Sequence, residues 1–202
     1  MKMQPTNFYR PTFAKIDLNE IKMNILNLKK HMNESIQVIA VVKANGYGHG
    51  DFEVSKAALE VGASMLAVAT PDEAIRLRVL GIESPILVMG ASPPAFAVLA
   101  SEQDITVTVF QKEWFLHIPT LPNKLKVHIK IDTGMGRLGV TTESELSMLI
   151  QIIHQRSDVL IDGVFTHFAT ADEENTEQFT NQLAKFQTFL QLFPERPKCI
   201  HT

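Results

Sequence analysis

Residues 38–50 have the sequence VIAVVKANGYGHG, in which an apolar run passes directly into Lys43 and a glycine-rich turn. Because Val, Ile and Ala follow one another without alternation, residues 38–42 are expected to form a strand buried on both faces, as in parallel sheets. Burial disfavours an ammonium charge, so we expect a lowered pKa and a nucleophilic amine at Lys43. Such an amine suits a Schiff base with an aldehyde cofactor.

The turn after Lys43 carries three glycines with a tyrosine between them. Gly46, Gly48 and Gly50 allow a sharp turn and close approach to a ligand, and their N–H groups could bind an anion. Tyr47 adds a hydroxyl donor. A lysine alone after an apolar strand more often carries its charge to the surface. The functional interpretation therefore depends on the whole string.

The string KANGYGHG resembles the cofactor-lysine motif of alanine racemases, a family of enzymes that use pyridoxal 5′-phosphate. The resemblance implies that Lys43 is catalytic and carries the cofactor covalently. It also implies that Tyr47, four residues later, contacts the cofactor phosphate.

The composition is that of an ordinary globular protein with room for a sizeable core. The chain has 202 residues, 45% hydrophobic and 20% charged, with a net charge of −3. This charge gives no electrostatic reason to expect nucleic acid or an anionic membrane as partner. Cys199 is the single cysteine and cannot form an internal disulfide, and no apolar run approaches about 18 residues. We therefore predict a cytoplasmic protein without a membrane partner.

Strand and helix patterns alternate along the rest of the chain. The patterns predict strands near residues 38–42, 65–69, 85–89, 105–109, 126–132, 159–168 and 198–202, and a short one within 8–16. They predict helices near residues 18–32, 51–61, 71–80, 92–101, 112–117, 142–153 and 179–193. Thr70 with Glu73 and Thr142 with Glu145 form capping boxes, and Asp51 is a plausible N-cap.

This alternation predicts an α/β fold with a parallel sheet covered by helices. Seven candidate strands at these intervals fit a (β/α)8 TIM-type barrel better than an open sheet. The count is about seven of eight strands, so we expect the barrel to be incomplete.

A second motif, KIDTGMGRLG, begins at Lys130, where the predicted strand ends. Gly134 and Gly136 permit a tight turn that could aim Arg137 inward, toward a cofactor phenolate or a substrate carboxylate. A solvated arginine is compatible with the same pattern. This motif also resembles the racemase family, which implies that Arg137 donates to the ring oxygen of the cofactor. The resemblance further implies that Lys130 is often carbamylated and holds the arginine.

A third motif, THFATADE, places His167 at the end of the sixth predicted main strand. A histidine there is more often a packing residue, but the resemblance implies that His167 lies against the cofactor ring. His49 has no role that the sequence indicates. His128 has no metal-ligating partner at useful spacing, and no CxxC, HxxxH or carboxylate cluster is present, so we predict no metal site.

The resemblance implies that residues 1–202 form the N-terminal, pyridoxal phosphate-binding barrel domain of an alanine racemase. Such an enzyme interconverts L- and D-alanine, supplies D-alanine for peptidoglycan, and is a homodimer when complete. Because the chain ends inside a predicted strand, we expect a fragment without the β-rich C-terminal domain that supplies the second base. We therefore expect these residues alone to be inactive.

Three alternatives remain open from the sequence. The chain could be a non-catalytic pyridoxal phosphate-binding protein of the homeostasis type, although those proteins lack the GYGHG run. It could be a racemase for another amino acid, such as serine or lysine. It could also be a structural or interaction remnant that binds no cofactor.

Overall fold

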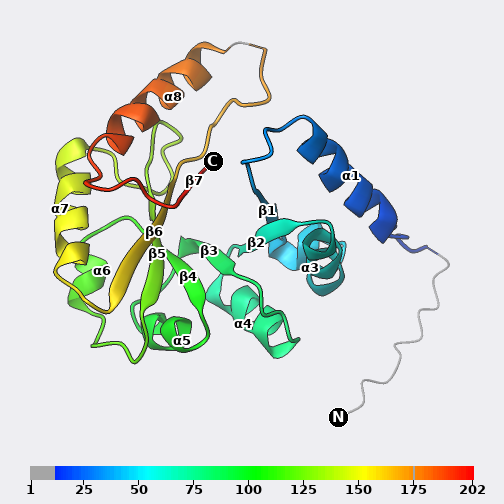
Figure 1. Ribbon diagram of the computed structural model, residues 1–202, viewed down its shortest axis with the longest axis horizontal. Helices are drawn as coiled ribbons and strands as arrows, with labels where there is room; N and C mark the ends of the chain where they lie inside the picture. The colour runs from blue at the N-terminus through cyan, green and yellow to red at the C-terminus, as the bar shows by residue number, and fades with distance from the viewer. Residues whose placement is uncertain (1–11, 175) are drawn as a thin grey trace.

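A computed structural model describes residues 12–174 and 176–202, and it shows an α/β fold built on one curled sheet (Figure 1). The strands are β1 Val38–Val41, β2 Ala63–Val68, β3 Ile86–Ala91, β4 Ile105–Val109, β5 Leu125–Lys130, β6 Val159–Phe165 and β7 Cys199–His201. The helices are α1 Leu18–Lys30, α2 Lys43–Tyr47, α3 Asp51–Glu60, α4 Pro71–Val79, α5 Phe96–Glu102, α6 Glu113–Leu116, α7 Glu143–His154 and α8 Glu177–Leu190. None of these helices is both long and apolar enough to span a membrane.

The seven strands are all parallel and lie in chain order across the sheet, from β1 to β7. The sheet curls into an incomplete barrel with helices on its outer side (Figure 1), which confirms the predicted fold class. Because the strands are parallel, their carboxyl ends meet at one end of the barrel. Lys43, Lys130 and His167 all come at or just after such ends.

The core of the sheet is built from cross-strand rows of large aliphatic side chains. Leu66 of β2 pairs with Ile86 of β3, which pairs with Ile105 of β4, and all three are at most 1% exposed. Complete burial of each such side chain contributes about 1.5–3 kcal/mol. These central strands therefore form a rigid base for the loops at their carboxyl ends.

Both predicted capping boxes are confirmed. Thr70 accepts a hydrogen bond from the Glu73 N–H while the Glu73 carboxylate accepts from the Thr70 N–H, and Pro71 takes the first helical position of α4. Thr142 and Glu145 make the same reciprocal pair at the start of α7. Each box satisfies N–H groups that the first turn of a helix leaves unpaired.

Two local predictions are wrong, and a third can be tested only in part. The strand of residues 38–42 is not buried on both faces, because β1 is an edge strand with only β2 beside it, and Val41 is 39% exposed. Within the range 8–16, residues 8–11 lie outside the described part, and residues 12–16 form no strand. Asp51 is not an N-cap but the first helical residue of α3, where it pairs with Arg76 of α4 and becomes buried.

Candidate active site

Lys43 follows β1 and opens a left-handed turn. The side chain is half-buried, so the strong desolvation expected from the sequence is not met. The next residues have positive φ angles: Ala44 52°, Asn45 55°, Gly46 60° and Tyr47 56°. For L-residues this conformation costs roughly 1–2 kcal/mol each, and such strain often lies at functional sites. The turn therefore fixes the backbone that follows Lys43 in the left-handed conformation.

The hydrogen bonds of this turn are mostly internal. The N–H of Gly46 donates to Val42 O (2.9 Å), that of Gly48 to Ala44 O (3.1 Å), and that of Gly50 to Asn45 O (2.9 Å). The prediction that the N–H groups of the three glycines bind an anion is therefore wrong. His49, to which the sequence gives no role, closes the same turn through its Nδ1 and Gly46 O, 2.9 Å apart.

The capping residue Glu73 ties the Lys43 turn to helix α4. One carboxylate oxygen accepts the Ala44 N–H at 2.7 Å, and the other accepts the N–H groups of Ala69 (2.7 Å) and Thr70 (3.1 Å). One side chain thus starts α4, caps the end of β2 and braces the residue after Lys43. The sequence predicts the first of these roles but not the bond to Ala44.

Lys130, at the end of β5, is buried on the inner face of the sheet. It is 6% exposed, and its Nζ lies 5.0 Å from the centre of the Phe165 ring. Burial lowers the pKa of Lys130, the charges of Arg137 and Lys43 lower it further, and Asp132 opposes them. The lowered pKa leaves more of the amine uncharged, which is the form that reacts with electrophiles.

The loop after Lys130 is shaped around the Asp132 carboxylate. It accepts backbone N–H bonds from Gly134 (2.9 Å), Gly136 (3.1 Å) and Arg137 (2.9 Å). Burial of Asp132 raises its pKa, but these N–H groups outweigh burial and hold the pKa below its ordinary value. The ionised carboxylate therefore fixes the loop that carries Arg137.

Arg137 and His167 lie on exposed loops at the same end of the barrel. Within the described residues, the Arg137 guanidinium makes no hydrogen bond or ion pair, so it is available to an anion. Desolvation lowers the pKa of His167, and the charges of Arg137, Lys130 and Lys43 lower it further. The positive charges of Arg137 and Lys43 thus act on both Lys130 and His167, which is consistent with neighbouring positions at this end of the barrel.

Tyr47 lies near Lys43, but its side chain is exposed to solvent. Its side chain is 60% exposed, and the Lys43 Nζ lies 5.8 Å from its ring centre. The hydroxyl is thus accessible to a ligand, and its contact with a cofactor phosphate stays a prediction.

A buried glutamine, which the sequence analysis misses, joins the loops that carry Arg137 and His167. Gln182 of α8 donates to Thr133 Oγ1 (3.2 Å) and His167 O (3.4 Å) and accepts the Ala169 N–H (3.0 Å). Thr133 also contacts Thr166 Oγ1 at 2.8 Å. A polar residue within the apolar face of the predicted helix 179–193 is the signal that could have identified Gln182.

The sequence indicates no metal-ligating partner for His128, whereas the structure places two residues with ligand atoms beside it. His128 Nδ1 lies 2.9 Å from His201 Nε2, and Cys199 is beside both rings. The three residues come from β5 and β7, so only the order of strands in the sheet brings them together.

Comparison with known proteins agrees with the motifs that surround this site. Residues 16–202 match the family model described as alanine racemase, N-terminal domain. The chain belongs to this family. It is 47% identical over 198 residues to alanine racemase from Geobacillus stearothermophilus. The aligned region covers 96% of this chain and 51% of that protein. This member of the alanine racemase family thus spans about half the length of the curated relatives it matches.

Solved structures of the alanine racemase family have the same fold as this chain. The structure of alanine racemase from Bacillus anthracis with bound L-Ala-P has a TM-score of 0.91 and 42% identity, covering 98% of this chain and 53% of that one. Histidine racemase from Leuconostoc mesenteroides has a TM-score of 0.85 and 30% identity, covering 91% of this chain and 50% of that one. The fold is thus shared by solved structures of racemases named for different amino acids.

Proposed function

We propose that this chain is the cofactor-lysine half of a pyridoxal 5′-phosphate-dependent alanine racemase. The observation that carries the proposal is the position of Lys43, Lys130, Arg137 and His167 at or just after the carboxyl ends of β1, β5 and β6, where the charges of Lys43 and Arg137 act on Lys130 and His167. Relatives named alanine racemase, at 47% identity to this chain, support the choice of reaction and substrate.

The donor set fits pyridoxal phosphate, which carries an aldehyde, a phosphate and a phenolate oxygen. The aldehyde reacts with an amine, and Lys43 offers one on a strained turn. Tyr47 offers an exposed hydroxyl for the phosphate, and Arg137 offers an unpaired guanidinium for the phenolate. When bound, the cofactor supplies the electron sink that stabilises negative charge at the substrate Cα.

Each functional residue of this chain then has a separate role in the proposed reaction. Lys43 Nζ takes the proton from Cα, or returns it, on one face of the substrate. Arg137 orients the cofactor through its ring oxygen and contributes to holding the substrate. Lys130, which we propose to be carbamylated, holds Arg137, and His167 packs against the cofactor ring.

Racemisation also needs a base on the opposite face of Cα, within about 2.6–3.2 Å of the proton or one water away. Tyr47 is assigned to the phosphate, and Tyr9, the other tyrosine, lies outside the described residues. We propose that a β-rich C-terminal domain supplies this base across a homodimer interface, with residues 1–202 as the N-terminal barrel domain. The relatives, about twice as long as this chain, leave room for such a domain.

The proposal includes a cellular setting. We place the enzyme in the cytoplasm, in keeping with its one free thiol, Cys199. Its product, D-alanine, would serve peptidoglycan synthesis.

The test is to follow exchange between L- and D-alanine, with added cofactor, in the complete protein and in the 202-residue chain. We expect enzymatic turnover in the complete protein, loss of it in its Lys43→Ala variant, and no enzymatic rate in the 202-residue chain. A complete protein that binds the cofactor without turnover would be a non-catalytic binding protein and would contradict the proposal. Turnover by the 202-residue chain, abolished in Lys43→Ala, would place the second base in this chain.

A racemase for another amino acid is the second candidate, favoured by the 30% identity to histidine racemase. The same assay with serine, lysine and histidine separates the two. We expect kcat/KM to be largest for alanine, and a larger value for another amino acid would replace alanine as the substrate.

A further inference from the structure

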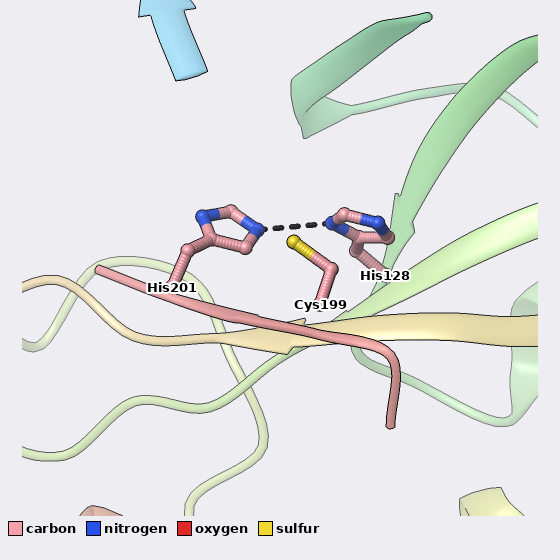
Figure 2. A group of neighbouring side chains, drawn as sticks. All are labelled: His128, Cys199 and His201. Atoms are coloured by element: carbon pink, nitrogen blue, oxygen red, sulfur yellow. Dashed lines mark hydrogen bonds between the residues drawn. The ribbon is translucent and has the colours of Figure 1, made fainter. Parts of the chain in front are cut away.

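Beside the candidate active site, three side chains of the sheet converge on one point (Figure 2). The group comprises His128 Nδ1 from β5 and Cys199 Sγ and His201 Nε2 from β7, and these atoms all lie within 4.8 Å of one another. None of the three has a role in the proposed racemase chemistry. We call them the His–Cys–His cluster.

The register of the sheet explains why the cluster forms. His128 pairs with Gly163 of β6, and Gly163 pairs with Cys199 of β7, so the three residues make one row across the sheet. His201 follows Cys199 by two residues and therefore points to the same face. In Figure 2 both side chains of β7 rise from the strand toward the His128 ring.

The middle of this row is open because residue 163 is a glycine. A Cβ at Gly163 would lie 2.6 Å from His128 Nε2 and 2.7 Å from two ring carbons, which no side chain could tolerate without moving the imidazole. The ring thus lies flat over the backbone of β6 with its Nδ1 toward β7. Gly163 shapes the cluster without contributing a ligand atom.

His128 has a carboxylate near its second ring nitrogen, as metal-binding histidines usually have. It is completely buried, its Nε2 makes no hydrogen bond within the described residues, and the Asp162 carboxylate lies 4.0 Å from that nitrogen. In metal sites a carboxylate on the far nitrogen of a histidine keeps the proton there and leaves the near nitrogen free to bind. Asp162 is placed to do this for His128.

We propose that His128, Cys199 and His201 bind a Zn²⁺ ion. Two imidazole nitrogens and one thiolate are ligands that zinc prefers, whereas magnesium and calcium prefer oxygen. Ligand atoms around tetrahedral zinc lie roughly 3.3–3.6 Å apart. The two nitrogens, now 2.9 Å apart, would therefore separate by only about 0.4 Å.

Binding exchanges a proton for the metal. The Cys199 S–H bond breaks, its proton passes to water, and the sulfur forms the bond to zinc, leaving a net charge of +1 on the ion and its thiolate. A water completes the fourth position.

The test is to titrate the 202-residue chain with Co²⁺, which takes zinc sites and reports a cobalt–thiolate bond by a near-ultraviolet charge-transfer band. Cys199 is the single thiol, so the band is specific. We expect one ion per chain, displacement by Zn²⁺, and protection of Cys199 from alkylation by Zn²⁺. We expect Cys199→Ser to lose the band and to weaken Zn²⁺ binding by more than about 100-fold, and Asp162→Asn to weaken it by about 10–100-fold.

The matched control is His154→Ala, which removes an exposed histidine at the end of α7 and should leave the titration unchanged. Circular dichroism and fluorescence of the single Trp114 verify that each variant is folded. Co²⁺ binding without the thiolate band, or equal affinities in the chain and in folded Cys199→Ser, would overturn the site. Because no readout uses the cofactor, failure here would leave the proposed function untouched.

Discussion

The two sides of the sheet differ in how firmly they hold their residues. On the β1 side, Lys43 follows an edge strand with an exposed Val41, and its turn is left-handed. On the β5–β6 side, Lys130 is buried in a strand paired on both sides, and Asp132 and Gln182 fix the loops beyond it. Under the proposed function, the reactive amine lies on the open side of the sheet, and the groups that orient the ligand lie on the rigid side.

The largest effect should come from removing the amine on the open side. In the complete protein we expect Lys43→Ala to lower kcat by about 10³–10⁴-fold, because proton transfer at Cα loses its positioned base. Lys130→Ala is the matched variant, and we expect it to cost less because Lys130 acts through Arg137. Steady-state racemisation assays measure both. A larger loss of kcat in Lys130→Ala than in Lys43→Ala would contradict the roles proposed for the two lysines.

The rigid side is tested next by Arg137→Ala. One charge-assisted contact is worth roughly 1.5–3 kcal/mol, so we expect kcat to fall about ten- to a hundredfold, and by more than cofactor affinity falls. Arg196→Ala, at an exposed position before β7, serves as the control and should retain full activity. An unchanged kcat in Arg137→Ala would show that the guanidinium is solvated instead.

The two capping boxes offer a test of whether Glu73 braces the Lys43 turn on the open side. Glu73 and Glu145 each cap a helix, but only Glu73 also accepts the N–H of Ala44, beside Lys43. We expect both alanine variants to lose about 1 kcal/mol of stability in denaturant unfolding. Only Glu73→Ala should also lower kcat/KM, by about tenfold, because the turn at Lys43 loses its anchor. Equal kcat/KM values in the two variants would show that Glu73 does not position Lys43.

The smallest effect should be a pH-dependent loss of stability in Asp132→Asn. The folded-state pKa of Asp132 lies below its unfolded value of about 3.9, so its carboxylate stabilises the fold above about pH 4. That stability is lost as the pH falls through the folded-state pKa. We expect the variant to be about 1 kcal/mol less stable at pH 7, with a gap that closes in acid. Urea unfolding at several pH values measures the gap, and a gap independent of pH would contradict the role of the charge.

Much of this fold could be predicted because local signals and the fold agree. The capping boxes fix the starts of α4 and α7, and β-branched runs mark the strands, with β4 predicted to the residue at 105–109. The strand alternation predicts the parallel sheet in chain order. Burial of β1 could not be predicted, because an apolar run does not state how many neighbours its strand has.

The rest depends on tertiary structure that no short pattern records. The positive φ angles of Ala44 and Asn45 are imposed by the fold around them, because the turn sequence alone points to its glycines. The partnership of His128 with Cys199 and His201 needs the register of β5, β6 and β7, which joins residues about seventy positions apart. Motif resemblance predicts the residues of the candidate site, but their supports come only from the structure.

The most direct test of the central claim is to identify the lysine that carries the cofactor. The complete protein, loaded with pyridoxal phosphate, is reduced with borohydride, digested and mapped by mass spectrometry. We predict a single pyridoxyl label on Lys43, the amine on the open side of the sheet. A label on Lys130, or no label in protein that holds the cofactor, would contradict it.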